Sequence, residues 1–146
     1  MSTFRTTRHF SASPQAVYAA FEQPECLAQW WGPEGFRNTF DVFDFRPGGV
    51  WRFTMHAPDG AAYPNDSSFV AIEPGRRIVV RHHSWPHFQL TIGLEESGAG
   101  TLVSWEQAFD SAEVAASLKH VVEPANEQNL TRWQRSVAAR DQATHG

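Results

Sequence analysis

Three histidines in one short stretch, His82, His83 and His87, are the residues best suited to metal or acid–base chemistry. A zinc site needs three or four ligands that converge on one tetrahedron. Residues 76–83 are predicted to form a β-strand, on which neighbouring side chains face opposite sides. Without a bulge, His82 and His83 therefore cannot reach the same ion, and His87 lies in the loop beyond. We expect no metal, and His82 remains the candidate for acid–base chemistry or ligand binding.

A reaction in a cavity would need an acid or base whose pKa is shifted by its surroundings. His82 fits this description if it faces inward, and Gln107 would complete a polar pair that orients a ligand carbonyl or hydroxyl. Glu106 alternates with Gln107 and is predicted to face solvent. Cys26 is interpreted as a small buried residue of a short helix. The chain has no Gly-x-Ser-x-Gly elbow and no phosphate-binding loop, and we expect no cofactor.

A Pro-Gly-Gly turn joins two aromatic segments within residues 44–53. Pro47 fixes its own φ and has no N–H to donate, while Gly48 and Gly49 accept positive φ at no steric cost. Alternation in the strand that follows places large apolar side chains on one face: Trp51, Phe53 and Met55. An aromatic wall of this kind is either the floor of a packed core or the wall of a pocket.

Composition limits the classes of function. The 146 residues are 41% apolar and 19% charged, which suits one domain spanning 1–146. A net charge of −4 argues against a nucleic-acid partner, and no apolar run is long enough to cross a membrane. The single cysteine excludes an internal disulfide and, with no signal-peptide pattern at the start, predicts a cytoplasmic protein. Six Trp and eleven Phe indicate a dense core or a lined cavity.

The periodicity of the sequence predicts an α+β fold. Alternating residues predict strands at 4–10, 36–45, 50–56, 69–72, 76–83, 88–95 and 101–109, with residues 61–66 irregular. Helical spacing predicts two short helices after the first strand, at 14–21 and 23–30, then a short helix at 111–119 and a longer one at 123–143. Ser13 is a suitable N-cap for the first helix, and Pro14 a suitable first residue.

Six sequential strands joined by short turns indicate an antiparallel meander. An apolar sheet face needs a covering layer, and the long C-terminal helix can supply it. A curved sheet of six to seven strands wrapped round that helix leaves a gap, so this architecture predicts a cavity. The alternative is that the chain's own side chains fill the space and leave only a packed core.

Four segments, in this order and at this spacing, resemble the START-like helix-grip superfamily, also called SRPBCC. They are FSASPQAVY at 10–18, WWGP at 30–33, DFRPGG at 44–49 and IEPGRRI at 72–78. Within the superfamily the chain is similar, over nearly its whole length, to small bacterial single-domain members of the family named for the activator of the heat-shock-protein-90 ATPase. It departs from the family pattern in the last helix, where members usually carry Gly-Trp and this chain has Ala125-Asn126.

The resemblance implies that the chain binds a hydrophobic or amphipathic small molecule in the cavity between the sheet and the C-terminal helix, with no assigned reaction. One alternative is an enzyme, a hydrolase or cyclase, that acts in the same cavity and uses His82 as its catalytic residue. Another alternative is an accessory protein of the chaperone ATPase. Fold alone does not choose among these functions.

The concave face is expected to supply a mostly apolar ligand site in which His82 and Gln107 are the polar groups. The predicted ligand-binding residues are Trp30, Trp51, Phe53, Met55, Val80, His82, Leu90, Val103, Trp105, Gln107 and Leu130. Phe40 and Val42 are expected on the other face of their strand, where an exposed apolar patch would favour a homodimer.

Overall fold

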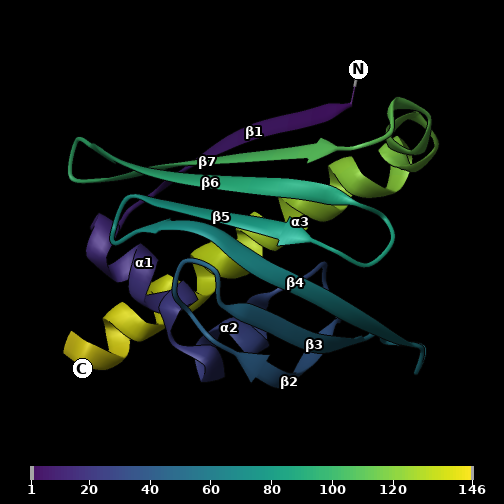
Figure 1. Cartoon of the computed structure of the whole chain (residues 1–146). Coiled ribbons are helices and arrows are strands. Elements are labelled where there is room, and N and C mark those ends of the chain that lie inside the picture. The colour runs from purple at the N-terminus through teal and green to yellow at the C-terminus, as the bar shows by residue number, and fades with distance from the viewer. Residues whose placement is uncertain (1, 146) are drawn as a thin grey trace.

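The computed structural model describes residues 2–145, in which seven antiparallel strands form one curved sheet (Figure 1). The strand order is β1-β7-β6-β5-β4-β3-β2, so consecutive strands from β2 to β7 are neighbours and β1 pairs with β7 at one edge. The strands are β1 Thr3–Phe10, β2 Arg37–Phe43, β3 Val50–His56, β4 Ala62–Glu73, β5 Arg77–His82, β6 Phe88–Ser97 and β7 Gly100–Phe109. This arrangement confirms the predicted meander and fold class.

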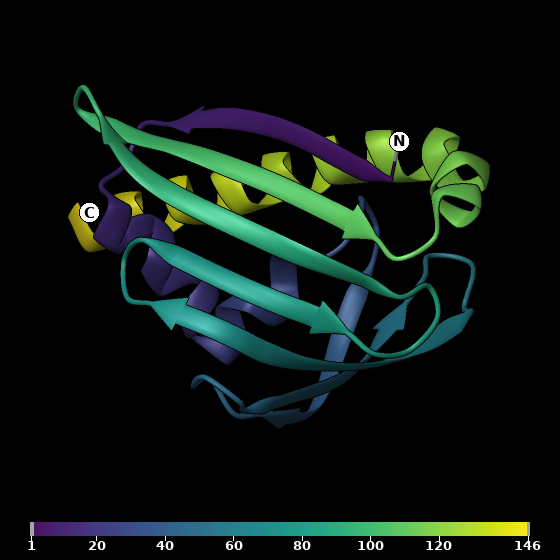
Figure 2. The ribbon, with the colours of Figure 1, turned by 45° about the horizontal axis from the view of Figure 1, so that its top comes forward.

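Within residues 2–145 three helices lie on one face of the sheet: α1 Pro14–Glu22, α2 Pro24–Trp30 and α3 Ala112–His145. The long α3 crosses behind the curved sheet, with α1 and α2 beside its C-terminal half (Figure 2). The Ser13 side chain accepts a hydrogen bond from the Ala16 N–H at 3.2 Å, and Pro14 is the first residue of α1. The predicted start of the first helix is therefore confirmed.

α3 is one continuous helix, so the prediction of two separate helices at 111–119 and 123–143 is wrong. Pro124 lies inside α3 and removes one backbone hydrogen bond, but the bonds on both sides keep the helix intact. The first turns run at an angle to the rest, as a proline kink would produce (Figures 1 and 2). No helix in the described part of the chain combines the length and the apolar character needed to span a bilayer.

Residues 61–66 were expected to be irregular, but from Ala62 onward they belong to the long strand β4. Pro64 is compatible with a strand here because residues 62–66 pair with β3, whereas pairing with β5 begins only at Ser67. Proline is tolerated where a strand has one unpaired edge. The consequence for the site is that β4 contributes several more inward-facing side chains than predicted.

Phe21 of α1 lies at the centre of an aromatic core. Its ring centroid lies 5.8–6.5 Å from those of Trp30, Trp31, Phe45, Trp51, Phe69 and Trp133. Trp30 stacks on Trp133 of α3 with centroids 4.7 Å apart. Their indole N–H groups donate to Ala20 O at 3.0 Å and Val17 O at 3.2 Å, respectively. The space between the sheet and helices α1 and α2 is therefore filled by side chains, and the indole N–H groups of both tryptophans have acceptors.

A β-bulge between Phe40 and Val42 changes which residues of β2 face inward. Phe40 pairs with Phe53 and packs against the core, whereas Val42 pairs with Arg52 and is 37% exposed. The extra residue at the bulge places Phe40 and Val42 on opposite faces. The prediction that Phe40 and Val42 form one exposed apolar patch, on which the expected homodimer was based, is therefore wrong.

The Pro-Gly-Gly turn is attached to β4 by backbone hydrogen bonds. The Gly48 N–H donates to Phe69 O at 2.7 Å, and the Phe69 N–H donates to Gly49 O at 2.9 Å. Gly48 has φ +83°, and a Cβ added at Gly49 would lie 1.9 Å from Asp44 O. The first position needs glycine for its backbone conformation, and the second needs it for lack of space.

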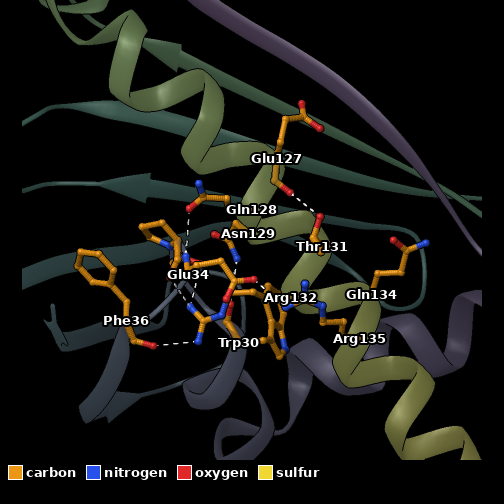
Figure 3. Close-up of polar contacts among 12 residues, drawn as sticks. Trp30, Glu34, Phe36, Glu127, Gln128, Asn129, Thr131, Arg132, Gln134 and Arg135 are labelled. Carbon is orange, nitrogen blue, oxygen red and sulfur yellow. Dashed lines mark hydrogen bonds and ion pairs between the residues drawn. The ribbon is translucent and has the colours of Figure 1, made fainter. Parts of the chain in front are cut away.

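Arg132 of α3 joins that helix to the segment between α2 and β2 (Figure 3). Its guanidinium donates to five backbone carbonyls at 2.6–3.2 Å: those of Gln29, Trp31, Gly32, Pro33 and Phe36. Nearby, the Asn129 amide donates to Trp30 O at 3.1 Å, and the Glu34 N–H donates to Gln128 Oε1 at 3.2 Å. The connection from α2 to β2 is therefore fastened along one side of α3.

We predict that Gly49→Ala lowers the free energy of unfolding by more than about 3 kcal/mol, because the new methyl group collides with backbone that cannot move away. In Gly48→Ala the new methyl group lies in open space, and only the left-handed φ is unfavourable. The free energy of unfolding should therefore fall by about 1 kcal/mol. Urea denaturation of both variants measures the difference. Equal losses would contradict this account of the turn.

Arg132→Lys is expected to lower the free energy of unfolding by about 2–4 kcal/mol, since an ammonium group has three donors and cannot reproduce the five bonds. Arg135→Lys on the same helix is the matched control. Arg135 pairs with Glu34 at the surface and should change stability far less. Chemical denaturation of the two variants would show similar losses if the carbonyl contacts were unimportant.

Candidate functional site

A cavity of about 410 Å³ lies between the concave face of the sheet and α3. Its volume falls in the range of small-molecule sites. The lining residues come from strands β3 to β7, the β5–β6 loop, the α2–β2 connection and α3. They are Trp31, Gly32, Pro33, Trp51, Phe53, Met55, Tyr63, Pro64, Asn65, Ser67, Val80, His82, Trp85, Pro86, Phe88, Leu90, Trp105, Gln107, Ala125, Asn126 and Asn129. Tyr63 and Trp85 are 51% and 65% exposed and mark the mouth.

Most of the predicted ligand-binding residues lie around this cavity: Trp51, Phe53, Met55, Val80, His82, Leu90, Trp105 and Gln107. Strand parity brings them together, because alternate residues of each strand face α3. Trp30, Val103 and Leu130 do not line it and lie in the packed core. Ligand binding by the residues around the cavity stays a prediction.

Several lining residues were missed by sequence reasoning. Trp31 follows the last residue of α2 with extended backbone, and its ring, 5.9 Å from that of Trp30, reaches the cavity. The sequence did contain a signal for this: the Gly-Pro pair at 32–33 ends the helix and gives Trp31 a different backbone conformation from Trp30. Tyr63 and Asn65 were missed because residues 61–66 were predicted to be irregular, and Ser67 because it precedes the predicted strand 69–72. All three share the parity of Phe69, a core residue.

Aromatic rings form a continuous wall in the cavity. The ring centroid of Trp31 lies 5.0 Å from that of Trp51 and 5.8 Å from that of Trp105. Trp51 stacks on Phe53 with centroids 4.4 Å apart. Gly32 beside this wall has φ +96°, and a Cβ there would lie 2.6 Å from the end of Met55. The wall therefore depends on glycine where the α2–β2 connection passes β3.

His82 and its partners form one polar corner of the cavity. Its Nδ1 lies 2.7 Å from Pro86 O, and its Nε2 lies 2.6 Å from Asn65 Oδ1 and 3.3 Å from Ser84 Oγ. The imidazole also stacks on Phe88 with centroids 4.5 Å apart. Both ring nitrogens are thus engaged by protein groups. His82 and Gln107, expected to form a pair, have separate partners.

Burial lowers the pKa of His82 below its ordinary value of 6.5, and the neighbouring His87 and His83 act in the same direction. The hydrogen bond to the Pro86 carbonyl opposes this shift. A neutral imidazole carries one N–H and can donate to only one of its two nearest oxygens, Pro86 O or Asn65 Oδ1. A second proton would allow donation to both oxygens, but would place a cation in a mostly apolar cavity.

Amides form a second polar corner, between β7 and α3. The Asn126 amide donates to Gln107 Oε1 at 3.1 Å. Asn129, one turn further along α3, is buried and donates to Trp30 O. Ala125 and Asn126 both line the cavity. Asn126 adds an amide to a wall that is otherwise largely apolar.

The other histidines lie outside this corner. His83 faces the opposite side of β5, where its Nε2 lies 2.7 Å from Ser68 Oγ. Within the described part of the chain, no three His, Cys, Asp or Glu side chains converge as a metal site requires. Glu106 faces outward and forms an exposed ion pair with Arg5 at 2.6 Å, in agreement with the predicted strand parity.

The lowered pKa of His82 predicts a pH dependence of stability. At high pH both states hold a neutral ring. As pH falls below about 6.5 the unfolded chain takes up the proton before the folded one does, so the free energy of unfolding decreases. His82→Gln should reduce this decrease, measured by urea denaturation at about pH 7.5 and about pH 5. His83→Gln is the matched control for loss of a histidine. If His82→Gln lost as much stability between the two pH values as the wild-type protein, the pH dependence would not come from His82.

Comparison with known proteins identifies a family. The family model described as Activator of Hsp90 ATPase homolog 1-like protein matches residues 11–139. No curated protein sequence matches the chain significantly.

Solved bacterial structures share the fold. A protein from Nitrosomonas europaea superposes with a TM-score of 0.88 at 17% identity, covering 96% of each chain. One from Chromobacterium violaceum has a TM-score of 0.81 at 26% identity, covering 92% of this chain and 96% of that one. An AHSA1-like protein from Aeromonas hydrophila has a TM-score of 0.78 at 20% identity, with coverage of 95% and 94%. From the match over residues 11–139 and the START-like helix-grip architecture, the chain belongs to the family of Activator of Hsp90 ATPase homolog 1-like proteins.

Proposed function

We propose that this protein binds an apolar or amphipathic small molecule in the cavity between the sheet and α3 and does not transform it. The observation that supports this proposal is an unfilled cavity of about 410 Å³ with aromatic walls and few polar groups. Binding sites for small molecules usually combine an apolar surface with a small number of fixed polar groups. We expect this binding to take place in the cytoplasm, where the single Cys26 stays reduced.

The state of His82 favours binding over catalysis. A general base needs a free lone pair within hydrogen-bond reach of the proton that it removes. Each nitrogen of His82 has a protein oxygen, of Pro86 or Asn65, at 2.6–2.7 Å, which leaves no space for a substrate proton beside either nitrogen. The lining also contains no carboxylate or amine that would act as a second acid or base. The hydrolase, cyclase and chaperone-accessory alternatives remain predictions.

The proposal predicts saturable binding of N-phenyl-1-naphthylamine, an uncharged fluorescent probe, with one site per chain. Asn126→Trp should weaken this binding at least about tenfold, because an indole at this position occupies the cavity. The family pattern that the sequence resembles has tryptophan at this position, so the variant is expected to fold. Fluorescence titration measures the affinity, and circular dichroism checks the fold.

Val121→Trp is the matched control, because it adds the same side chain to α3 at a position that is 54% exposed and outside the cavity. It should bind the probe as the unmodified protein does. Absence of probe binding, or equal effects of the two variants, would contradict binding in this cavity.

A further inference from the structure

The cavity lining carries no formal charge. Among the described residues around it there is no Asp, Glu, Lys or Arg, and the polar side chains are amides, hydroxyls, indoles and one imidazole. The guanidinium of Arg132 is occupied by backbone carbonyls of the α2–β2 connection. A carboxylate or ammonium ligand would lose its hydration here without gaining a counter-ion, and a buried charge without a partner is strongly unfavourable. The cavity therefore suits an uncharged molecule.

Two buried amides of the lining have unused hydrogen-bonding atoms. Gln107 of β7 accepts from Asn126 through Oε1. Asn129 of α3 donates to Trp30 O through Nδ2. In the described part of the chain, Gln107 Nε2 and Asn129 Oδ1 have no partner, although the two residues are only 9% and 6% exposed. Each amide is thus held by one bond and keeps a second polar atom unused.

These two atoms can be reached from the cavity. Within the described residues, the polar side-chain atoms that the protein encloses fully without a partner are Asn38 Oδ1, Trp51 Nε1 and Trp105 Nε1. Gln107 Nε2 and Asn129 Oδ1 do not belong to this enclosed set, so both keep accessible surface. Because both residues line the cavity and are otherwise buried, that surface faces the cavity.

The unused donor and the unused acceptor are both neighbours of Asn126. The Asn126 amide contacts Gln107 at 3.1 Å, and Asn129 lies three residues further along α3, on the same face of the helix. Gln107 Nε2 carries N–H groups that donate, and Asn129 Oδ1 is a carbonyl oxygen that accepts. A single small group with one acceptor and one donor can therefore bond to both.

We propose that the cavity selects an uncharged, largely apolar molecule that carries a carboxamide group. Its carbonyl accepts from Gln107 Nε2, and its N–H donates to Asn129 Oδ1. Trp105 shares the inward face of β7 with Gln107, and its ring lies 5.8 Å from that of Trp31, so aromatic surface beside the amides receives the apolar body of the ligand. This inference rests on the proposed binding function and specifies the chemical class of the ligand.

Three ligands of the same shape test this proposal: 2-naphthamide, 2-isopropylnaphthalene, which lacks both the donor and the acceptor, and 2-naphthoate. Each is titrated against the complex with N-phenyl-1-naphthylamine at about pH 7.5, where the naphthoate is ionised. The naphthamide should bind at least about a hundredfold more tightly than the naphthoate, because only the naphthoate brings a charge into the uncharged lining. Equal affinities would contradict the selection of an uncharged ligand.

Gln107→Met removes the unused donor and keeps the length of the side chain. It should reduce the ratio of the naphthamide affinity to the isopropylnaphthalene affinity about tenfold, the equivalent of one hydrogen bond. Comparing this ratio between proteins cancels the different hydrophobicity of the two ligands. Asn129→Leu removes the unused acceptor and should lower the ratio similarly. Circular dichroism checks the fold, and using both variants guards against the misfolding of either one.

Gln89→Met is the matched control. It makes the same substitution on β6 at a position between Phe88 and Leu90, which line the cavity, so residue 89 faces the opposite side of the sheet. This variant should keep the affinity ratio of the unmodified protein.

The outcomes separate the two proposals. If the ligands bind but Gln107→Met and Asn129→Leu keep the full affinity ratio, or if Gln89→Met lowers it equally, the carboxamide contacts are wrong and the binding function stands. If the naphthoate binds as tightly as the naphthamide, the ligand class is wrong and the binding function again stands. If neither the probe nor any of the three ligands binds, the proposed binding function fails as well.

Discussion

The contacts of Arg132 with five backbone carbonyls are the constraint on which the site depends. Burial lowers the pKa of Arg132, but a guanidinium stays charged in proteins. The carbonyl oxygens take the place of water around the cation and require the chain to curve round it. Trp31, Gly32 and Pro33 supply three of these carbonyls and also line the cavity. One interaction therefore attaches α3 to the sheet side of the fold and positions part of the cavity wall.

The space between sheet and helix is divided into a filled part and a hollow part. Phe21 and the stacked pair of Trp30 and Trp133 fill the region near α1 and α2. The hollow part adjoins the β5–β6 loop and residues Ala125 to Asn129 of α3, where the helix offers small or polar side chains. A helix with large apolar residues along its whole inner face would close this gap. The cavity thus follows from the uneven distribution of bulk along α3.

The polar groups of the cavity explain its expected lack of chemistry. The two ring nitrogens of His82 contact Pro86 and Asn65, and Gln107 bonds to Asn126, so these groups hold the walls together. Buried polar groups that are satisfied in this way make a site rigid. The indoles of Trp51 and Trp105 are different because the protein provides them with no acceptor among the described residues.

Local rules in the sequence were sufficient for the architecture and much of the cavity. Alternation along β3, β5, β6 and β7 predicted which side chains face α3, because residues i and i+2 of an extended chain share a face whatever the tertiary context. The Pro-Gly-Gly turn and the helix N-cap at Ser13 could also be predicted from the sequence, since each depends on residues close together in the chain. Local rules failed at Pro64 and Pro124, where tertiary context allowed a strand and a helix to continue.

The tertiary structure alone decided which of two adjacent tryptophans reaches the cavity. Trp30 stacks on Trp133, more than a hundred residues away, and only this packing places Trp30 in the core and leaves Trp31 for the wall. The bulge that separates Phe40 from Val42 and the bond between Gln107 and Asn126 likewise depend on partners brought together by folding. Sequence periodicity determines the face to which a side chain belongs. Whether that face is filled or hollow depends on the volumes and partners that distant segments bring to it, which no local pattern contains.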